Sequence, residues 1–264
     1  MRINKLRQRW AKGEVASCLW IDLGWPVSVE ALARLPYDSF TLDLQHSLID
    51  RATAVQVLQA LSLGSGAPLV RVSQNDPAEI GFVLDAGAYG VICPQIETAQ
   101  DCKRFVDACR YAPEGRRSWG PTRGLMYGGA DYFKGYKENV VTVALIETVK
   151  GVENMREIAA TPGLDMLYVG PNDLTIDYGG EPTYIASDPR VLAAMELSIE
   201  LARENSITSG TYAGSVEVAR AAVTKGYNLV SVGYASKIMV KAAGDLLGQV
   251  FPHAAASQAR STAG

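Results

Sequence analysis

Short apolar runs, many rich in β-branched residues, alternate along the chain with longer stretches in which apolar residues recur at helical spacing. Nearly continuous apolar runs of this length are typical of strands buried on both faces of a parallel sheet. We expect eight strands, at Ser17–Leu23, Phe40–Leu44, Pro68–Val72, Gly90–Pro94, Val140–Ile146, Met166–Gly170, Ile207–Tyr212 and Leu229–Gly233. We expect helices near Ser28–Leu35, Arg51–Leu63, Pro77–Ala86, Ala99–Cys109, Val152–Ala160, Pro189–Asn205, Val216–Thr224 and Ser236–Leu247. Eight alternations within 264 residues predict a single α/β domain, a (β/α)8 TIM barrel, rather than an open sheet.

The two ends of the chain do not fit this alternation. Residues 1–14 are charged and predict an extra N-terminal helix that is solvated. Residues 252–264 are mostly small or polar and predict a flexible C-terminal tail. The barrel domain is therefore expected to span residues 1–251.

One internal segment also interrupts the alternation of strands and helices. Tyr111–Asn139 is long for a connection and rich in Gly, Arg and aromatic residues. We expect it to be a long loop that follows the fourth strand and begins at the mouth of the barrel, where it forms a lid or a subunit contact.

Composition and charge exclude several classes of protein. The chain has 25 basic and 28 acidic residues and a net charge of −3, whereas nucleic-acid binders usually show a basic excess. No stretch has the roughly 18 continuous apolar residues that would cross a membrane, and the charged N-terminus does not resemble a signal peptide. The four cysteines form no Cys-x-x-Cys pair and are expected to be buried free thiols in the cytoplasm.

Two neighbouring strands end in carboxylates. Glu147 closes the fifth strand, and Asp173 follows the sixth. Because consecutive parallel strands end at the same edge, the two acids should lie side by side, and paired oxygen ligands with open coordination positions suit Mg²⁺ or Mn²⁺. Each acid also precedes a helix, where the helix dipole favours negative charge without any metal.

Other polar residues are expected at the same mouth. His46 follows the second strand, and an imidazole can carry a proton near neutral pH. Asp43, three residues earlier, could orient its ring. Arg71 ends the third strand and, if buried, must face an anion, either a substrate or a barrel carboxylate. No lysine stands at an expected strand end, which counts against a Schiff-base mechanism.

With these residues in place, the chain resembles the HpcH/HpaI aldolase family, the class II pyruvate aldolases that act on 4-hydroxy-2-oxo acids. The matching pieces are Leu19-Trp20, Asp43-Leu44-Gln45-His46, Val70-Arg71-Val72, Ile146-Glu147-Thr148 and Val169-Gly170-Pro171-Asn172-Asp173-Leu174. They occur in family order between about residue 13 and residue 250.

The resemblance implies an enzyme that reversibly cleaves a 4-hydroxy-2-oxo acid to pyruvate and an aldehyde. It implies that Glu147 and Asp173 hold Mg²⁺ or Mn²⁺, with Co²⁺ as an alternative, and that pyruvate chelates this metal as its enolate forms. Arg71 would steady the enolate oxygen, and His46, paired with Asp43, would move the proton of the 4-hydroxyl. Substrate-binding residues would be Trp20, Gly170, Pro171, Asn172, Leu174 and, in the long loop facing the aldehyde, Arg123. The resemblance also implies a homohexamer in which neighbours exchange the last helix.

Two departures from the family pattern leave the reaction open. Gln45 stands where the family often has Glu, and Leu145 stands where it often has Gln, on the same strand face as Glu147. Alternative functions are therefore oxaloacetate decarboxylation, carbon–carbon bond formation with another acceptor, or binding of keto acids without catalysis.

Overall fold

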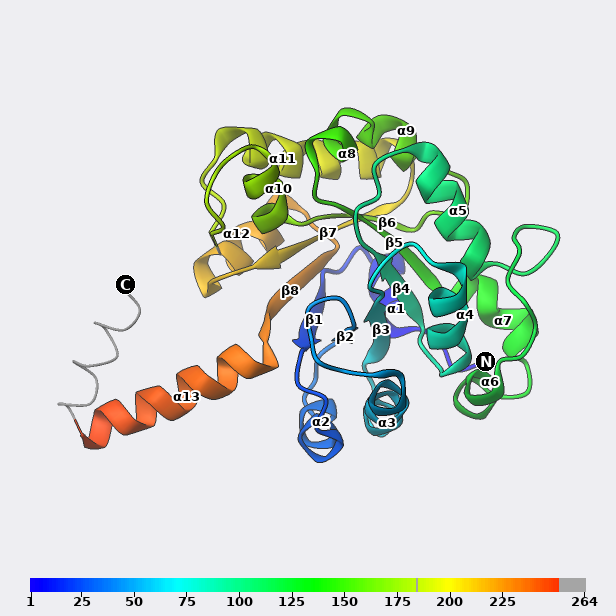
Figure 1. Cartoon of the computed structure of the whole chain (residues 1–264), viewed down its shortest axis with the longest axis horizontal. Helices are drawn as coiled ribbons and strands as arrows, with labels where there is room; N and C mark the ends of the chain where they lie inside the picture. Colours follow the sequence, from blue (N-terminus) through cyan, green and yellow to red (C-terminus); the bar gives the residue numbers. More distant parts are fainter. Residues whose placement is uncertain (184, 252–264) are drawn as a thin grey trace.

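Eight parallel strands close into a barrel in the order in which they occur along the chain (Figure 1). A computed structural model describes residues 1–183 and 185–251, so the expected C-terminal tail lies outside the described residues. The strands are β1 Ala16–Ile21, β2 Ser39–Asp43, β3 Ala67–Arg71, β4 Gly90–Cys93, β5 Val141–Ile146, β6 Met166–Val169, β7 Thr208–Ala213 and β8 Leu229–Tyr234. Every neighbouring pair is parallel, β8 with β1 included. The TIM-barrel prediction is confirmed.

Helices follow the strands, and all but the last of them, α13, cover the outside of the barrel. They are α2 Pro26–Ala33, α3 Arg51–Leu61, α4 Pro77–Asp85, α5 Ala99–Cys109, α8 Val149–Glu153, α9 Met155–Ala159, α10 Pro171–Asp177, α11 Pro189–Glu204, α12 Val216–Lys225 and α13 Ala235–Val250. Side-chain caps begin several of them. Asp76, for example, accepts a hydrogen bond from the backbone N–H of Ala78 and precedes a proline at the first helical position.

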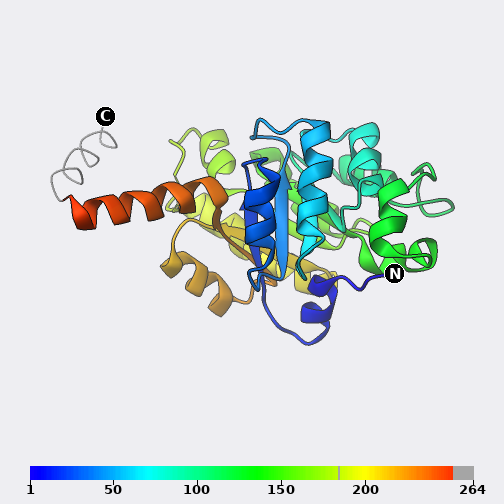
Figure 2. The ribbon, with the colours of Figure 1, turned by 90° about the horizontal axis from the view of Figure 1, so that it is seen from below.

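The interior of the barrel is closed at the amino ends of the strands by helix α1, Lys5–Ala11 (Figure 2). Leu6 is fully buried in the cluster that fills the barrel, and Trp10 packs against the same cluster. The basic residues of α1 are paired: Arg7 lies 2.7 Å from Asp165, and Arg9 lies 3.0 Å from Asp38. The N-terminal helix is therefore confirmed, but it is a plug of the barrel rather than a solvated helix.

The long segment before β5 differs from the prediction in both structure and place. It contains two short helices, α6 Thr122–Gly128 and α7 Tyr132–Asn139. It follows α5 rather than β4, and α5 has already carried the chain back to the amino ends of the strands. The backbone N–H of Arg2, near the barrel plug, donates to the carbonyl of Gly128 at 2.9 Å. The segment is thus not a lid over the mouth of the barrel.

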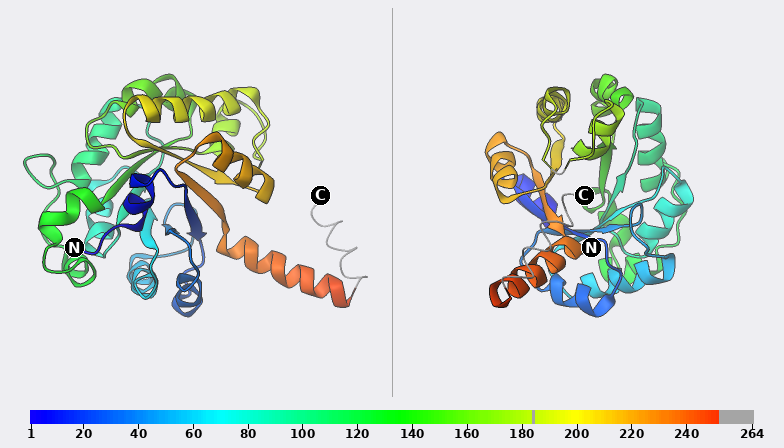
Figure 3. Two further views of the ribbon diagram at one scale, coloured as in Figure 1. Left: turned by 180° about the vertical axis from the view of Figure 1, so that it is seen from behind. Right: turned by 60° about the vertical axis from the view of Figure 1, so that its left-hand side comes forward.

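Helix α13 projects away from the barrel (Figures 1 and 3). None of its residues is buried, and Met239, Leu246 and Val250 are among its exposed apolar side chains. A groove of about 660 Å³ remains over β1, β8 and α12, lined by apolar residues such as Val223 and Val230. In the part of the chain that the structure describes, no helix is long and apolar enough to cross a membrane.

Candidate active site

A cavity of about 50 Å³ lies at the carboxyl ends of the strands and collects most of the residues singled out in the sequence. Its lining consists of Trp20, Arg71, Leu145, Glu147, Tyr168, Gly170, Pro171, Asn172, Asp173, Tyr212 and Tyr234. These residues come from β1, β3, β5, β6, β7 and β8 or from the residues that directly follow them. The strand ends therefore meet as the barrel geometry requires.

Glu147 is the most buried acid in this cavity, with 3% of its surface exposed. Its Oε1 accepts a hydrogen bond of 3.0 Å from the backbone N–H of Gln95. Burial, followed by the negative charge of Asp173, raises the pKa of Glu147 to about 7, although Arg71 and the Gln95 N–H oppose the shift. A cation beside Glu147 would favour its charged form and oppose this shift.

Gln95 is a residue that sequence reasoning missed. It follows β4 and has a φ of 52°, in the left-handed region that non-glycine residues seldom adopt. This conformation directs its backbone N–H onto Glu147, while its side chain is exposed. No residue type marks such a position in a sequence, because the interaction uses only the backbone.

Arg71 and Asp43 form a buried pair beside the cavity. Arg71 Nε donates to Asp43 Oδ1 at 2.9 Å, and Arg71 Nη2 donates to Asp43 Oδ2 at 2.6 Å. Burial lowers the pKa of Arg71, but the hydrogen bonds and charge of Asp43 outweigh this effect and raise the pKa. The guanidinium also lies 4.6 Å from the ring centroid of Trp20. Arg71 is thus held in one place, with Nη1 left outside the pairing with Asp43.

His46 lies at the mouth but does not line the cavity. Its side chain is exposed, and its backbone N–H donates to Asp43 Oδ1 at 3.3 Å. Among the described residues, no hydrogen bond joins the imidazole to Asp43, so the expected ring-orienting pair is not formed. The reason is that the Asp43 carboxylate is already occupied by Arg71 and by the backbone N–H groups of Gln45 and His46.

The residues after β6 shape the other wall. Gly170 faces Glu147 so closely that a Cβ atom there would lie 3.0 Å from Glu147 Oε2 and 3.1 Å from Glu147 Cβ. Asp173 is exposed at the mouth. Leu174, by contrast, is fully buried in the core outside the cavity, and its N–H donates to the carbonyl of Gly170 at 3.2 Å. Leu174 therefore does not line the cavity with which the sequence associated it.

Arg123 lies at the opposite end of the barrel. Its guanidinium donates to the carbonyls of Ala86 at 2.8 Å and Leu58 at 3.0 Å, at the C-terminal ends of α4 and α3. Helices of the barrel run antiparallel to the strands, so these helix ends mark the amino ends of the strands. Arg123 therefore does not reach the cavity of the barrel to which it belongs, because only segments that directly follow a strand reach the mouth.

An aromatic wall closes the cavity on the side of β1, β7 and β8. The ring of Trp20 lies 5.5 Å from that of Tyr234, and the ring of Tyr212 lies 5.2 Å from that of Tyr234. Tyr168 forms the floor, and its hydroxyl donates to Ser231 Oγ at 2.8 Å. The three tyrosines were missed as site residues, although Tyr234 is the last residue of β8 and Tyr212 the last but one of β7, where attention to strand ends would have found them.

The residues present fit a divalent cation with open coordination positions. Glu147 and Asp173 supply carboxylates, and Oδ1 of Asn172 is a buried acceptor without a hydrogen-bond partner among the described residues. Within residues 1–183 and 185–251, no group of three or more His, Cys, Asp or Glu side chains could hold a metal. With two carboxylates at the site, water and substrate would complete the coordination of the ion.

Comparisons with known proteins identify the family of this chain. Residues 16–242 match the family model described as HpcH/HpaI aldolase/citrate lyase. A hydroxypyruvate/pyruvate aldolase from Rhizorhabdus wittichii is 37% identical over 229 residues, which is 87% of this chain and 91% of that protein. A 5-keto-4-deoxy-D-glucarate aldolase from Klebsiella pneumoniae is 35% identical over 232 residues, 87% of this chain and 90% of that protein. The crystal structure of an HpcH/HpaI aldolase/citrate lyase family protein from Burkholderia cenocepacia superposes with a TM-score of 0.87 at 30% identity, covering 94% of this chain and 99% of that one.

Proposed function

Because the chain belongs to the HpcH/HpaI aldolase/citrate lyase family, we propose that it is a divalent-metal-dependent aldolase that cleaves a 4-hydroxy-2-oxo acid to pyruvate and an aldehyde. The proposed metal is Mg²⁺ or Mn²⁺, with Co²⁺ as an alternative. Glu147 and Asp173 are the proposed ligands.

One observation carries this proposal: two carboxylates and a fixed guanidinium border the same small cavity. Glu147 and Asp173 follow the neighbouring strands β5 and β6, and Arg71 ends β3. A 2-oxo acid has a carboxylate and a keto oxygen on adjacent carbons, so it can bridge a cation at the two carboxylates and the guanidinium of Arg71.

The bound cation would act as a Lewis acid and place positive charge beside the keto oxygen of the substrate. Arg71, held by Asp43, would donate from its remaining N–H groups to the oxygen that becomes negative as the bond between C3 and C4 breaks. Asp43 is thus a positioning residue for Arg71, rather than for His46 as the sequence suggested.

His46 would take the proton of the 4-hydroxyl as the aldehyde carbonyl forms. The electrons of the broken bond move to the pyruvate fragment, which then takes a proton at C3. The aromatic wall of Trp20, Tyr212 and Tyr234 would keep water from the enolate during this step.

The test is an assay of pyruvate release from a panel of 4-hydroxy-2-oxo acids. Pyruvate and hydroxypyruvate are both included as nucleophiles in the reverse direction, because the Rhizorhabdus relative carries both in its name. We expect turnover with Mg²⁺ or Mn²⁺ and its loss with EDTA. No pyruvate release from any substrate, or release unaffected by EDTA, would contradict the proposal.

A different reaction of the same enolate is the second candidate. The observation that favours it is Leu145, which lines the cavity beside Glu147 with an apolar side chain. Leu145 offers no hydrogen bond to a substrate hydroxyl there, so it does not favour a hydroxy-oxo acid over other substrates. The same site could therefore support oxaloacetate decarboxylation or addition of the enolate to another acceptor. Comparing the turnover of oxaloacetate with that of hydroxy-oxo acids separates the two candidates.

We also propose that copies of the chain associate through α13. The helix presents apolar side chains that nothing in its own barrel covers, and the groove over β1, β8 and α12 is lined by valines. The α13 of a second copy would fit this groove, in line with the exchange of the last helix and the homohexamer that the resemblance implies.

A further inference from the structure

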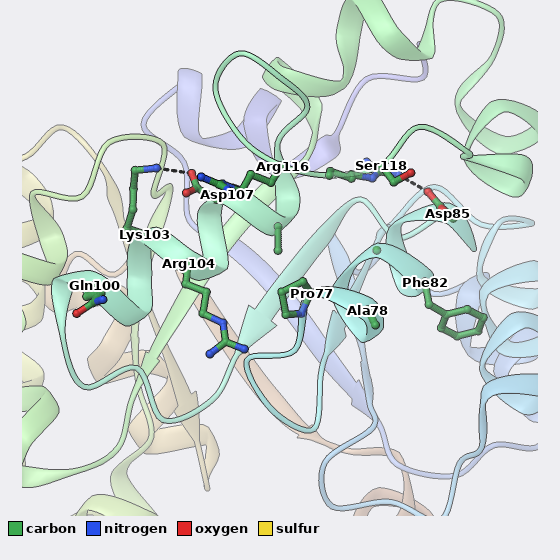
Figure 4. A pocket seen from close by; sticks show the side chains of 13 residues that line it. Pro77, Ala78, Phe82, Asp85, Gln100, Lys103, Arg104, Asp107, Arg116 and Ser118 are labelled. Carbon is green, nitrogen blue, oxygen red and sulfur yellow. Dashed lines mark hydrogen bonds and ion pairs between the residues drawn. The ribbon is translucent and has the colours of Figure 1, made fainter.

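A second, larger hollow lies on the outside of the barrel, between α4, α5 and the segment 116–118 (Figure 4). Its volume is about 840 Å³, within the range of pockets that hold small organic ligands. No residue that lines it lines the active-site cavity. It is therefore a separate hollow, which we call the α4–α5 groove.

The two sides of the α4–α5 groove differ in chemistry. The α4 side is formed largely by the apolar and small residues Pro77, Ala78 and Gly81. The α5 side and the segment 116–118 carry Lys103, Arg104, Arg116 and Arg117. The lining holds four basic side chains and two acidic ones, Asp85 and Asp107, although the whole chain has a net charge of −3. Positive charge is thus concentrated on the α5 side of the α4–α5 groove, opposite the apolar residues of α4.

Two of these cations have no acceptor in the part of the chain that the structure describes. Lys103 pairs with Asp107, and Arg117 pairs with Asp85 at 2.8 Å. Arg104 and Arg116 make neither a hydrogen bond nor an ion pair with any described side chain. Figure 4 shows Arg104 extending from α5 toward the start of α4, where Pro77 lies. Arg104 and Pro77 thus line the same groove.

Arg117 supplies an independent observation. Its side chain is only 1% exposed, yet it lines the groove. Its Nη groups bind Asp85 and the Tyr132 hydroxyl, but its Nε is buried without a hydrogen-bond partner among the described residues. The guanidinium lies 4.7 Å from the ring centroid of Tyr111 and 5.6 Å from that of Tyr132. Arg117 therefore contributes a fixed positive charge from within the wall of the groove.

Gly81 shows that the groove is open on the α4 side. A Cβ atom added there would meet no atom within 4 Å, and the residue lies within a regular helix. Gly81 can therefore be replaced by residues with larger side chains, which would extend into the groove. Because glycine is unfavourable inside a helix, such substitutions should not weaken α4.

We propose that the α4–α5 groove binds a small organic anion, with a carboxylate or phosphate group against Arg104 and Arg116, the buried charge of Arg117 behind them, and an apolar body against Pro77, Ala78 and Gly81. Guanidinium groups suit both kinds of anion, since each offers paired oxygens. The apolar body distinguishes this ligand from inorganic phosphate, which would contact only one side of the groove. The proposal does not depend on the reaction at the carboxyl ends of the strands.

The experiment is calorimetric titration of the purified full chain with phenyl phosphate, benzoate and inorganic phosphate. We expect phenyl phosphate or benzoate, whichever has the right head group, to bind at least about tenfold more tightly than inorganic phosphate. Gly81→Leu should weaken that binding about tenfold or more by filling the groove, and Gly81→Ala is the matched control that keeps it. The double variant Arg104→Gln/Arg116→Gln should weaken it to a similar extent and reduce its salt dependence.

Three results would overturn the proposal. The first is no saturable binding of phenyl phosphate or benzoate at millimolar concentrations. The second is equal binding by the wild type and Gly81→Leu, which would place the anion elsewhere, for example in the active site. The third is a loss of oligomer mass in Gly81→Leu without any anion binding to the wild type, which would identify the groove as a contact between subunits.

Discussion

The backbone N–H of Gln95 donates a hydrogen bond to Glu147 Oε1 at 3.0 Å, and Gln95 adopts a left-handed φ of 52° in making it. The donor comes from the loop after β4, whereas the acceptor ends β5. The loop after β4 thus fixes the position of Oε1 of Glu147, a proposed metal ligand at the end of the neighbouring strand. The second oxygen, Oε2, faces Gly170, where the absence of a side chain leaves room for it.

Replacing Gln95 should therefore weaken metal binding without touching a ligand. A β-branched residue tolerates a positive φ poorly, so Gln95→Val should lower the free energy of unfolding by about 1–2 kcal/mol and shift the Glu147 carboxylate. Gln95→Gly adopts the same backbone without strain and should keep metal affinity. Titration calorimetry with Mn²⁺ and thermal unfolding of both variants measure the two effects. Equal metal affinity in Gln95→Val and wild type would show that this hydrogen bond does not position the ligand.

The raised pKa of Glu147 predicts how metal binding depends on pH. The carboxyl group has a pKa of about 7 in the metal-free protein, above its usual 4.5, and only its deprotonated form can bind a cation. Affinity should therefore be highest above pH 7 and should fall by about tenfold per pH unit as the pH drops below that value. Mn²⁺ titrations between pH 5.5 and 8 in buffers of different ionisation enthalpy would also detect the released proton. A flat affinity across this range would contradict the assignment of Glu147.

His46 should matter for cleavage more than for the chemistry of pyruvate itself. If the imidazole takes the 4-hydroxyl proton, His46→Ala should slow release of the aldehyde by about 10²–10⁴-fold. Exchange of the pyruvate methyl protons involves no hydroxyl and should change much less. Measuring both rates on the same preparation gives the ratio directly. Equal slowing of the two reactions would place His46 in enolate formation or in substrate binding instead.

Association through α13 should respond to charge on either face of the proposed contact. Leu246→Arg on α13 and Val223→Arg in the groove each place a charge in an apolar interface, so each should reduce the molar mass measured by light scattering. Lys241→Gln, on the solvent-exposed surface of the same helix, is the control and should leave the mass unchanged. A monomeric wild type, or full mass in both arginine variants, would contradict the proposed exchange.

The barrel could be predicted from the sequence because its periodic signal is repeated eight times. Strands that are buried on both faces are almost wholly apolar, and each is followed by a helical pattern, so a mistake in one element does not change the fold. Because the carboxyl ends of barrel strands converge, the sequence also predicted that Arg71, Glu147 and Asp173 lie close together. In the structure all three line one cavity.

Other features depend on geometry that residue order does not record. The resemblance implies that Arg123 faces the aldehyde at the mouth, but α5 lies between β4 and its segment and returns the chain to the other end of the barrel. Asp43 stands close to His46 in sequence, yet its two oxygens match the fork of Arg71 across the strands. Gln95 contributes through its backbone conformation alone, which its residue type does not reveal.

The central claim is that Glu147 and Asp173 hold a divalent cation at which pyruvate forms its enolate beside Arg71. The most direct test is exchange of the pyruvate methyl protons in D2O, followed by NMR, because it requires no knowledge of the aldehyde. We expect exchange with Mg²⁺ or Mn²⁺, its loss on adding EDTA, and its loss in Glu147→Ala and Asp173→Ala while both variants remain folded by circular dichroism. Exchange that persists in EDTA, or at the wild-type rate in either variant, would contradict the claim.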